Sequence, residues 1–422
     1  MNFKTLLFGI LNLCFFQTKA QVYTSYFTGN STDLEVQPKG GVCLMSGGSE
    51  NDNAMRWFLE QANGGDIVVL RTSGSDGYNN YFFSELGVNV NSVETIVCNN
   101  ALSGSDEYII SRISKAEGLW FAGGNQALYL SYWRNSEVLQ TIQNRIDDGI
   151  IVGGISAGMA ILGEHYFSAE NGTITSNEAL SQPFHPNLTL GSSDFLNIPF
   201  LENTITDTHY NNPDRRGRHS VFLSRLINEN PLVKGIACDE HVAVCIDTNG
   251  IAKIFGDYPN YNDYAWFIRP NCSIANNSPE ILSENAALTW SQNQEAISVY
   301  KVPANGNNTF NLNDWQTGTG GTWQFWFINN GQFESNEAPP INCGLSVSNN
   351  QTTILKVIWD DEQTFHFNTP VDKLQIFNSL GQKVPYSNEE SGRYNLKKMG
   401  DFYFFQIEIE GKIEVLKVTH VF

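Results

Sequence analysis

Short apolar runs alternate with amphipathic stretches between about residues 40 and 260, and this alternation restricts the fold more than any other feature. Continuous apolar strands separated by helices are typical of a parallel sheet that is covered on both faces. The pattern therefore predicts an α/β fold with a doubly wound, mostly parallel sheet. The expected strands are Val42–Met45, Ile67–Leu70, Thr95–Val97, Gly118–Ala122, Ile150–Gly153, Thr204–Thr208 and Gly235–Cys238, and the expected helices are Asn53–Ala62, Asp106–Ala116, Asn125–Trp133 and Ser136–Ile146.

The chain of 422 residues is long enough for two or three domains. Residues 1–20 combine a basic Lys4, a short apolar run and small residues before a cut site, which predicts a secretory signal peptide. The α/β core is expected at 21–260. Helical periodicity then disappears, so 261–340 are predicted to form a β-rich extension of the core. Residues 345–422 alternate with period two, which predicts a small separate β-sandwich.

The charge balance excludes some partners. There are 25 Lys and Arg residues against 44 Asp and Glu residues, and the formal net charge of −19 becomes more negative when a signal peptide containing Lys4 and Lys19 is removed. Nucleic acids and anionic membranes attract basic surfaces, so neither is an expected partner. No later stretch reaches the roughly 18 consecutive apolar residues of a spanning helix, so we expect no membrane insertion.

Six cysteines follow the signal peptide, and export permits disulfides. Cys43, Cys98 and Cys238 lie in apolar runs and are expected to be buried thiols. Cys272 and Cys343 lie in polar sequence and are candidates for a disulfide with each other. The spacing fits no zinc site, because there is no C-x-x-C and there are no paired histidines, so no metal is expected.

The strongest chemical signal is the segment Gly154-Ile155-Ser156-Ala157-Gly158, which ends an apolar run and begins a helical pattern. This is the context of a G-x-S-x-G nucleophile elbow, where a tight turn lifts the serine hydroxyl above the sheet. The Ala157 amide is then a candidate donor to an oxyanion. The alternative is a glycine-rich turn with an incidental serine.

A serine nucleophile needs a base, usually a histidine that a carboxylate orients. His209 follows the run 204–208, so it is expected at the carboxyl end of a strand, level with the elbow. His165 is too close to the elbow and His185 lies in a proline-rich loop. The residues alone leave the acid open among Glu164, Glu170, Glu178, Asp194 and Asp207.

Two further segments are candidates for the site. Gly123 and Gly124 follow another strand, and one of their amides would supply the second oxyanion donor. The run Asp214-Arg-Arg-Gly-Arg218 places three arginines after His209, which indicates recognition of a carboxylate by bidentate contacts. The alternative is a solvated helix start with an ion pair to Asp214.

Taken together, residues 40–250 resemble the cyanophycinase/dipeptidase E family of serine peptidases. The resemblance implies a class I glutamine-amidotransferase-like fold that uses serine in place of cysteine, with Ser156 as nucleophile and His209 as base. The matching segments are Gly47-Gly48-Ser49-Glu50, Phe121-Ala-Gly-Gly-Asn-Gln126, Gly154-Ile-Ser-Ala-Gly158, Asp207-Thr-His-Tyr210 with Arg216-Gly-Arg218, and Gly235-Ile-Ala-Cys-Asp-Glu240.

The same resemblance assigns further roles. It implies Glu178 as the acid, with Glu170 as the alternative, and no metal or organic cofactor. Gln126 and Arg216 match positions that hold the β-aspartyl-arginine unit in cyanophycinases, and Arg216 or Arg218 would bind a substrate carboxylate. Val221 stands near the place where cyanophycinases carry a further arginine, so the chain departs from the family there.

Residues 345–422 resemble the C-terminal sorting domains of type IX secretion cargo, through Val371–Lys383 and Gly400–Phe405. The resemblance implies the type IX secretion machinery as a partner and a secreted or cell-surface location. The sequence leaves a homodimer open.

The leading hypothesis is therefore a secreted serine exopeptidase or isopeptidase that cleaves aspartyl-containing peptides, with cyanophycin as a candidate. Two alternatives stay open: a catalytically silent binding protein of the same fold, and an esterase of the α/β-hydrolase type.

Overall fold

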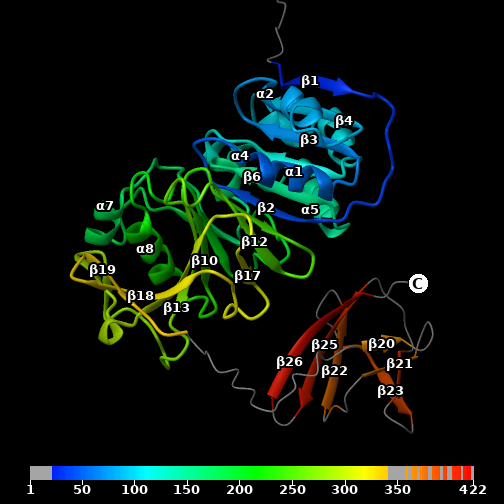
Figure 1. Cartoon of the computed structure of the whole chain (residues 1–422). Helices are drawn as coiled ribbons and strands as arrows, with labels where there is room; N and C mark the ends of the chain where they lie inside the picture. Colours follow the sequence, from blue (N-terminus) through cyan, green and yellow to red (C-terminus); the bar gives the residue numbers. More distant parts are fainter. Residues whose placement is uncertain are drawn as a thin grey trace, which may run out of the picture. The chain divides into compact units, whose positions relative to one another are not determined.

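The structure is a computed structural model (Figure 1), and the chain divides into two compact units, residues 1–343 and 344–422. The described residues are 21–340 and the following parts of the second unit: 357–359, 364–367, 371, 373–378, 383–389, 393–396, 402–409 and 412–419. The predicted signal peptide, residues 1–20, lies outside them. No helix among the described residues is long and apolar enough to cross a membrane.

One sheet of the first unit has, within the described residues, nine strands in the order β1-β4-β3-β5-β6-β2-β11-β12-β17. Its centre, β4-β3-β5-β6-β2, is parallel, as the apolar runs predict. The flanking strands are antiparallel, including an edge strand, β1, that the sequence did not indicate. The strands are β1 (Tyr23–Gly29), β2 (Gly41–Met45), β3 (Asp66–Arg71), β4 (Ser92–Cys98), β5 (Gly118–Phe121), β6 (Ile151–Ile155), β11 (Ala243–Ile246), β12 (Ile251–Phe255) and β17 (Thr309–Asn311).

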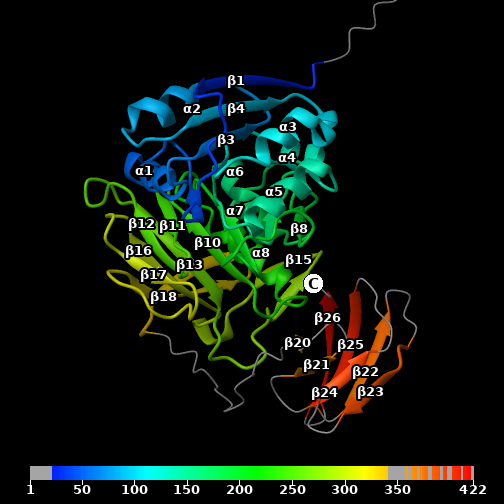
Figure 2. The ribbon, with the colours of Figure 1, turned by 90° about the vertical axis from the view of Figure 1, so that its right-hand side faces the viewer.

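Helices cover both faces of this sheet, as Figure 2 shows, with α1 on one side and α3, α4 and α5 on the other. Each of these helices begins at an Asn, Asp or Ser whose side chain accepts backbone N–H groups of the first turn. The helices of the unit are α1 (Asp52–Gln61), α2 (Gly77–Asn80), α3 (Glu107–Ile113), α4 (Gln126–Trp133), α5 (Glu137–Asp147), α6 (Ala157–Ala160), α7 (Ser176–Ser181) and α8 (Arg216–Leu226).

A second sheet contains strands that the sequence pattern placed in the first. Its order within the described residues is β19-β18-β16-β13-β10-β9-β7-β8. Only β7, β9 and β10 are mutually parallel, and the remaining pairs are antiparallel. The strands are β7 (His165–Phe167), β8 (Leu190–Ser192), β9 (Thr204–Asp207), β10 (Lys234–Cys238), β13 (Tyr264–Pro270), β16 (Ile297–Pro303), β18 (Thr322–Asn329) and β19 (Gln332–Glu337), with a separate hairpin of β14 (Ile281–Ser283) and β15 (Ala286–Thr289).

The expectation of one doubly wound sheet is therefore wrong in this respect: the fold is α/β with two mixed sheets that are partly parallel. Apolar runs identify buried strands but not their neighbours, so the sequence could not show that β9 and β10 pair away from β6. The region 261–340 supplies four strands of the second sheet, and side chains of both sheets share one hydrophobic cluster.

The second unit contains two antiparallel sheets in its described parts, β20-β21-β24-β23 and β22-β25-β26. Side chains of both sheets, such as Phe365 and Phe405, share one cluster. The strands are β20 (Val357–Trp359), β21 (Thr364–Phe367), β22 (Lys373–Asn378), β23 (Tyr386–Glu389), β24 (Arg393–Leu396), β25 (Phe402–Ile409) and β26 (Lys412–Thr419).

The described cysteines fall into two groups. Cys43, Cys98, Cys238 and Cys245 are free and buried, the first three as predicted. Cys272 is disulfide-bonded, and its predicted partner, Cys343, lies outside the described residues.

Candidate active site

Ser156 sits on the sharp turn between β6 and α6. Its backbone has φ 53° and ψ −115°, a conformation that a residue with a side chain adopts only under strain. A Cβ on Gly158 would lie 2.0 Å from the Phe121 carbonyl oxygen, and one on Gly154 would lie 2.7 Å from the Gly158 carbonyl carbon. Both flanking glycines are therefore required by close backbone approach, which is the physical basis of the G-x-S-x-G pattern.

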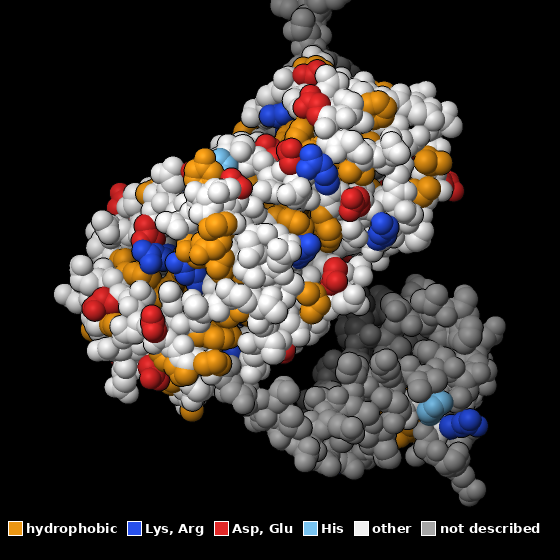
Figure 3. Space-filling model, in the orientation of Figure 1, with side chains coloured by type: hydrophobic (Ala, Val, Ile, Leu, Met, Phe, Trp, Pro, Cys, Tyr) orange, Lys and Arg blue, Asp and Glu red, His pale blue; other side chains and the backbone are white. Residues whose placement is uncertain are grey.

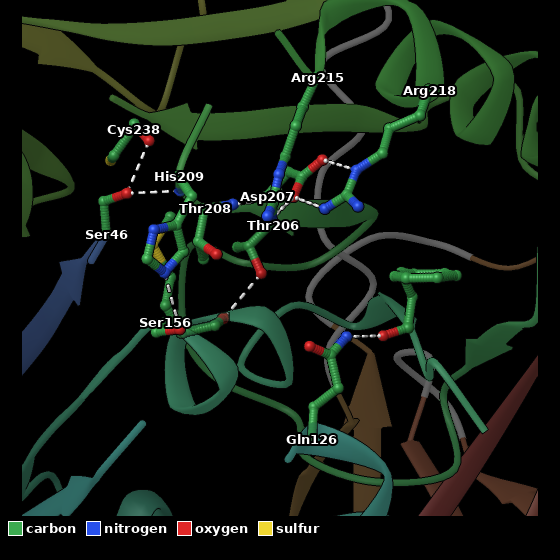
Figure 4. Close-up of polar contacts among 12 residues, drawn as sticks. Ser46, Gln126, Ser156, Thr206, Asp207, Thr208, His209, Arg215, Arg218 and Cys238 are labelled. Carbon is green, nitrogen blue, oxygen red and sulfur yellow. Dashed lines mark hydrogen bonds and ion pairs between the residues drawn. The ribbon is translucent and has the colours of Figure 1, made fainter. Parts of the chain in front are cut away.

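His209 lies two residues after β9, where its Nε2 is 2.9 Å from the Ser156 Oγ. Its backbone is held in place, because its N–H donates to the Ser46 Oγ at 2.7 Å and that hydroxyl donates to the Cys238 carbonyl at 2.7 Å (Figure 4). A Cβ on Gly47 would lie 2.2 Å from the imidazole, so only glycine leaves room for the ring. The structure thus brings together the predicted nucleophile and base.

Glu240 completes the chain of contacts. Its Oε1 is 2.8 Å from the His209 Nδ1, its Oε2 accepts from the Asn212 Nδ2 at 3.2 Å, and its backbone N–H donates to the Asn211 Oδ1. The hydrogen bond from His209 lowers the pKa of the Glu240 carboxyl, so this group is ionised at neutral pH. A carboxylate in this position holds the imidazole in the tautomer that accepts a proton at Nε2.

The acid predicted from the family resemblance, Glu178, does not contact His209. Its carboxylate accepts from the Thr175 N–H at 2.9 Å and from the Thr175 hydroxyl at 2.7 Å, which forms a capping box at the start of α7. The alternative, Glu170, pairs with Arg134 at 3.4 Å. Both residues stabilise local structure, and the prediction for the acid is corrected to Glu240.

Sequence reasoning missed Glu240 although a signal was present. The parallel register pairs Asp207 of β9 with Ala237 of β10, so the residues after the two strands emerge at the same edge. Asp239 and Glu240 directly follow the apolar run of β10. The candidate acids in the sequence all precede His209, whereas Glu240 follows it, just after the strand that pairs with β9.

The predicted oxyanion donors are the amides of Ala157 and of Gly123 or Gly124. Ala157 is the first residue of α6, so its N–H has no carbonyl partner within that helix. A Cβ on Gly123 would lie 3.5 Å from the Ser156 Cβ, whereas one on Gly124 would face Ser73 at the same distance. Gly123 is therefore the glycine that lies against the nucleophile.

The guanidinium of Arg218 is not available to bind a substrate. It is buried together with Asp207, and its Nε donates to the Asp207 Oδ2 at 2.9 Å while its Nη2 donates to Oδ1 at 2.5 Å. Its Nη1 donates to the Ile174 carbonyl. This ion pair lowers the pKa of Asp207 against the effect of burial. The prediction that Arg218 binds substrate is corrected, because its donors are already used inside the protein.

Arg216 is more accessible. It forms a bidentate contact with Asp214 and lies over the Phe333 ring at 5.1 Å. In Figure 3, basic side chains lie beside hydrophobic ones over the region of α8 and β19. Arg215 approaches Asp207 at 3.6 Å, and its Nε has no hydrogen-bond partner (Figure 4). Of the three arginines, 215 and 216 are the ones with accessible side chains.

Gln126, the first residue of α4, donates through its Nε2 to the Phe167 carbonyl. Val221, which stands where cyanophycinases carry an arginine, is fully buried among the apolar side chains around α8. The carboxamide of Gln126 thus has a structural partner, and Val221 contributes no polar group to the site.

Comparisons with known proteins find similarity over the middle of the chain. Residues 75–254, which include Ser156, His209 and Glu240, match the model of peptidase family S51. A cyanophycinase of Synechococcus elongatus is 25% identical over 228 residues, which cover 51% of this chain and 66% of the relative. A cyanophycinase of Geminocystis herdmanii (strain PCC 6308) is 23% identical over 175 residues, which cover 41% of this chain and 58% of the relative. The matched segments thus span about two thirds of those proteins or less.

Two solved structures are also similar to part of the chain. A peptidase from an acI-B1 Actinobacterium has a TM-score of 0.39 and 14% identity, covering 52% of this chain and 89% of that one. A putative peptidase E protein from Listeria monocytogenes EGD-e has a TM-score of 0.35 and 18% identity, covering 52% and 98%.

Proposed function

We propose that this chain is a serine peptidase of family S51 that forms an acyl-enzyme on Ser156. The observation that carries the proposal is the continuous contact from the Ser156 Oγ through His209 to Glu240, with distances of 2.9 Å and 2.8 Å. A catalytically silent protein of this fold has no need for a strained serine facing an oriented imidazole. An α/β-hydrolase esterase would place its acid between serine and histidine in the sequence, whereas Glu240 follows His209.

The geometry supports acyl transfer. His209 accepts the Ser156 proton at Nε2 while the serine oxygen attacks a substrate carbonyl carbon, and Glu240 stabilises the imidazolium that results. The amides of Gly123 and Ala157 would donate to the oxyanion. His209 then gives its proton to the leaving amine, which breaks the C–N bond. Water, deprotonated by the same histidine, hydrolyses the acyl-enzyme and regenerates Ser156.

The proposed substrates are peptides with an aspartyl residue on the acyl side of the cleaved bond, including β-aspartyl-arginine units. The names of the cyanophycinase relatives support this class. Arg216 is the proposed partner of the aspartyl carboxylate, because Arg218 is enclosed with Asp207. Binding would require the substrate carboxylate to compete with Asp214 for this guanidinium.

The proposal extends to location and export. A signal peptide at 1–20 and a type IX sorting domain at 345–422 would take the protein to the cell surface or the medium. The disulfide-bonded Cys272 supports an oxidising compartment, since such bonds are rare in reducing ones.

The test is to incubate the purified protein with cyanophycin and with Asp-X dipeptides and to identify the products. We expect release of β-Asp-Arg or cleavage of the Asp-X bond, and loss of both in Ser156→Ala. Ser131→Ala, which removes an exposed hydroxyl on α4, is the matched control and should keep full activity. A Ser156→Ala protein as active as the wild type would overturn the proposed nucleophile. Cleavage of nitrophenyl esters without any peptide cleavage would favour the esterase reading.

A further inference from the structure

A cavity lies at the other end of the second sheet, away from the proposed active site. It has a volume of about 470 Å³ and is lined around the start of β10 and the end of β13. Glu240 follows the carboxyl end of β10, whereas Lys234 begins that strand and lines the cavity. The volume is in the range of small-molecule sites and far exceeds that of one bound water.

Two cations face each other across neighbouring strands in this cavity. The antiparallel register, in which Gly235 pairs with Ile268, sets Lys234 opposite Arg269. Like charges that are directly opposed destabilise a pair of strands. Burial lowers the pKa of Lys234, and repulsion from Arg269 lowers it further. Burial also lowers the pKa of Arg269, to about 10. The sheet therefore holds two positive charges in an unfavourable arrangement.

No carboxylate in the described part of the chain neutralises this pair, and the Lys234 Nζ lies over the Trp315 ring, 4.9 Å from its centroid. No carboxylate there lies within ion-pair distance of either cation, and Asp314 and Glu202 attract them only from farther away. The Nε and Nη2 of Arg269 are enclosed without a hydrogen-bond partner. The same holds for the Oγ of Ser298, which lies opposite Arg269 on β16 and is fully buried. Three donor atoms in one row of the sheet thus lack an acceptor.

The walls of the cavity add a second property. Among the described residues that line it there is no Asp or Glu, although acidic residues outnumber basic ones in the whole chain, 44 to 25. Ile227, Val233 and Ile274 supply apolar surface. Water could satisfy the hydrogen bonds of Arg269, but it carries no charge and would leave the repulsion with Lys234 in place. An anion with an apolar portion fits both properties.

We propose that this cavity binds a small organic carboxylate with a short apolar chain. The carboxylate would lie between Lys234 and Arg269, and the chain would lie against Ile227, Val233 and Ile274. Since Nε and Nη2 are enclosed, Nη1 is the guanidinium nitrogen through which Arg269 would contact the ligand. The site shares no residue with Ser156, His209 and Glu240, so it does not depend on the proposed peptidase activity.

The experiment is titration calorimetry on the protein from residue 21 to 422, with hexanoate, the neutral hexanamide and inorganic sulfate as probes. We expect hexanoate to bind with one site per chain, and hexanamide and sulfate to bind at least about tenfold more weakly. Lys234→Met and Arg269→Met should each weaken hexanoate binding about tenfold or more, because each removes half of the positive charge. The matched control is Lys253→Met, which removes a cation that also lies over an aromatic ring, Phe255, but on an exposed surface. It should leave binding unchanged.

Equal affinities for hexanoate and hexanamide would show that the charge of the ligand plays no part in binding. Equal affinities for hexanoate and sulfate would show that the apolar walls play no part. Either result, or the absence of hexanoate binding, overturns the proposal. If one methionine variant fails to fold, Lys234→Gln serves in its place. Ser156→Ala should bind hexanoate as the wild type does, so failure here and failure of the proposed peptidase function are distinguishable.

Discussion

The two ends of β10 differ in how completely their polar groups are paired. At the carboxyl end, Glu240, His209 and Ser156 form one chain of hydrogen bonds. At the amino end, Lys234 and Arg269 oppose each other, and no carboxylate of the described residues lies within ion-pair distance of either. The first arrangement is complete without any ligand, and preorganised groups of this kind are what catalysis requires. In the second arrangement the repulsion between the two cations remains unless an anion binds, so one end of β10 carries a preformed group of contacts and the other carries uncompensated charge.

The largest expected effect comes from removing the negative charge of Glu240, just after the carboxyl end of β10. Glu240→Gln keeps the shape but removes the charge that orients His209, and we expect kcat to fall by roughly 10²–10⁴-fold. Glu178→Gln is the matched control, since its carboxylate serves only the α7 cap, and its kcat should stay within about twofold of the wild type. Steady-state kinetics on an aspartyl peptide give the kcat of both variants. The reverse ranking would restore Glu178 as the acid.

Next in size is the contrast between a paired and an unpaired buried arginine. Arg218→Met leaves the buried Asp207 with only the more distant Arg215, at 3.6 Å, as an ion-pair partner, so we expect the free energy of unfolding to fall by roughly 3–5 kcal/mol. Arg269→Met removes a cation for which the described residues supply no ion-pair partner, so its unfolding free energy should stay level or rise. Urea unfolding of both variants measures the difference. Equal losses would mean that Arg269 is neutralised in a way the described contacts do not show.

A smaller effect is expected when a methyl group is added beside the His209 imidazole. The Cβ of Gly47→Ala would lie 2.2 Å from the imidazole, whereas that of Gly123→Ala would lie 3.5 Å from the Ser156 Cβ, an ordinary contact. We expect Gly47→Ala to displace the base and lower kcat by about 10²-fold, since a shift of about 1 Å at a catalytic group has that scale. Gly123→Ala should change kcat much less. The ring position can be followed by NMR of the imidazole protons, and an unmoved ring with normal kcat would contradict the steric argument.

The smallest effect concerns His219, a buried side chain with no hydrogen-bond partner at either ring nitrogen. Burial lowers its pKa to about 4, so in acid the unfolded chain takes up a proton that the folded protein does not. Its contribution to stability is therefore lost as the pH falls below the unfolded value. Between pH 7 and pH 5 the expected loss is about 2 kcal/mol.

His219→Phe should remove that loss, while His185→Gln should keep it, because His185 is only half-buried. Urea unfolding of both variants at the two pH values gives the comparison. The same acid sensitivity in His219→Phe and in wild type would show that another group is responsible.

Local sequence was sufficient to predict that Ser156 and His209 meet, because strand, glycines and helix coincide at Ser156 and His209 follows a strand. It was insufficient for the acid, because Glu240 reaches His209 only through the pairing of β9 with β10. The same limit applies to Arg218. Its spacing resembles that of a substrate-binding arginine, but its partner Asp207 lies on a strand beneath α8 and encloses it. Pairing between strands is a property of the whole chain, and no short motif records it.

Ser156 extends from the first sheet, and His209 and Glu240 extend from the second. Hydrogen bonds of the Ser46 hydroxyl, just after β2, and of the Thr206 hydroxyl, on β9, join the two. The proposed peptidase activity therefore requires the two sheets to keep their alignment. A slip of one layer along the other would separate the hydroxyl from the imidazole while both layers stayed folded. On gentle heating, the proposed peptidase activity would then be lost at a lower temperature than the one at which the helices unfold.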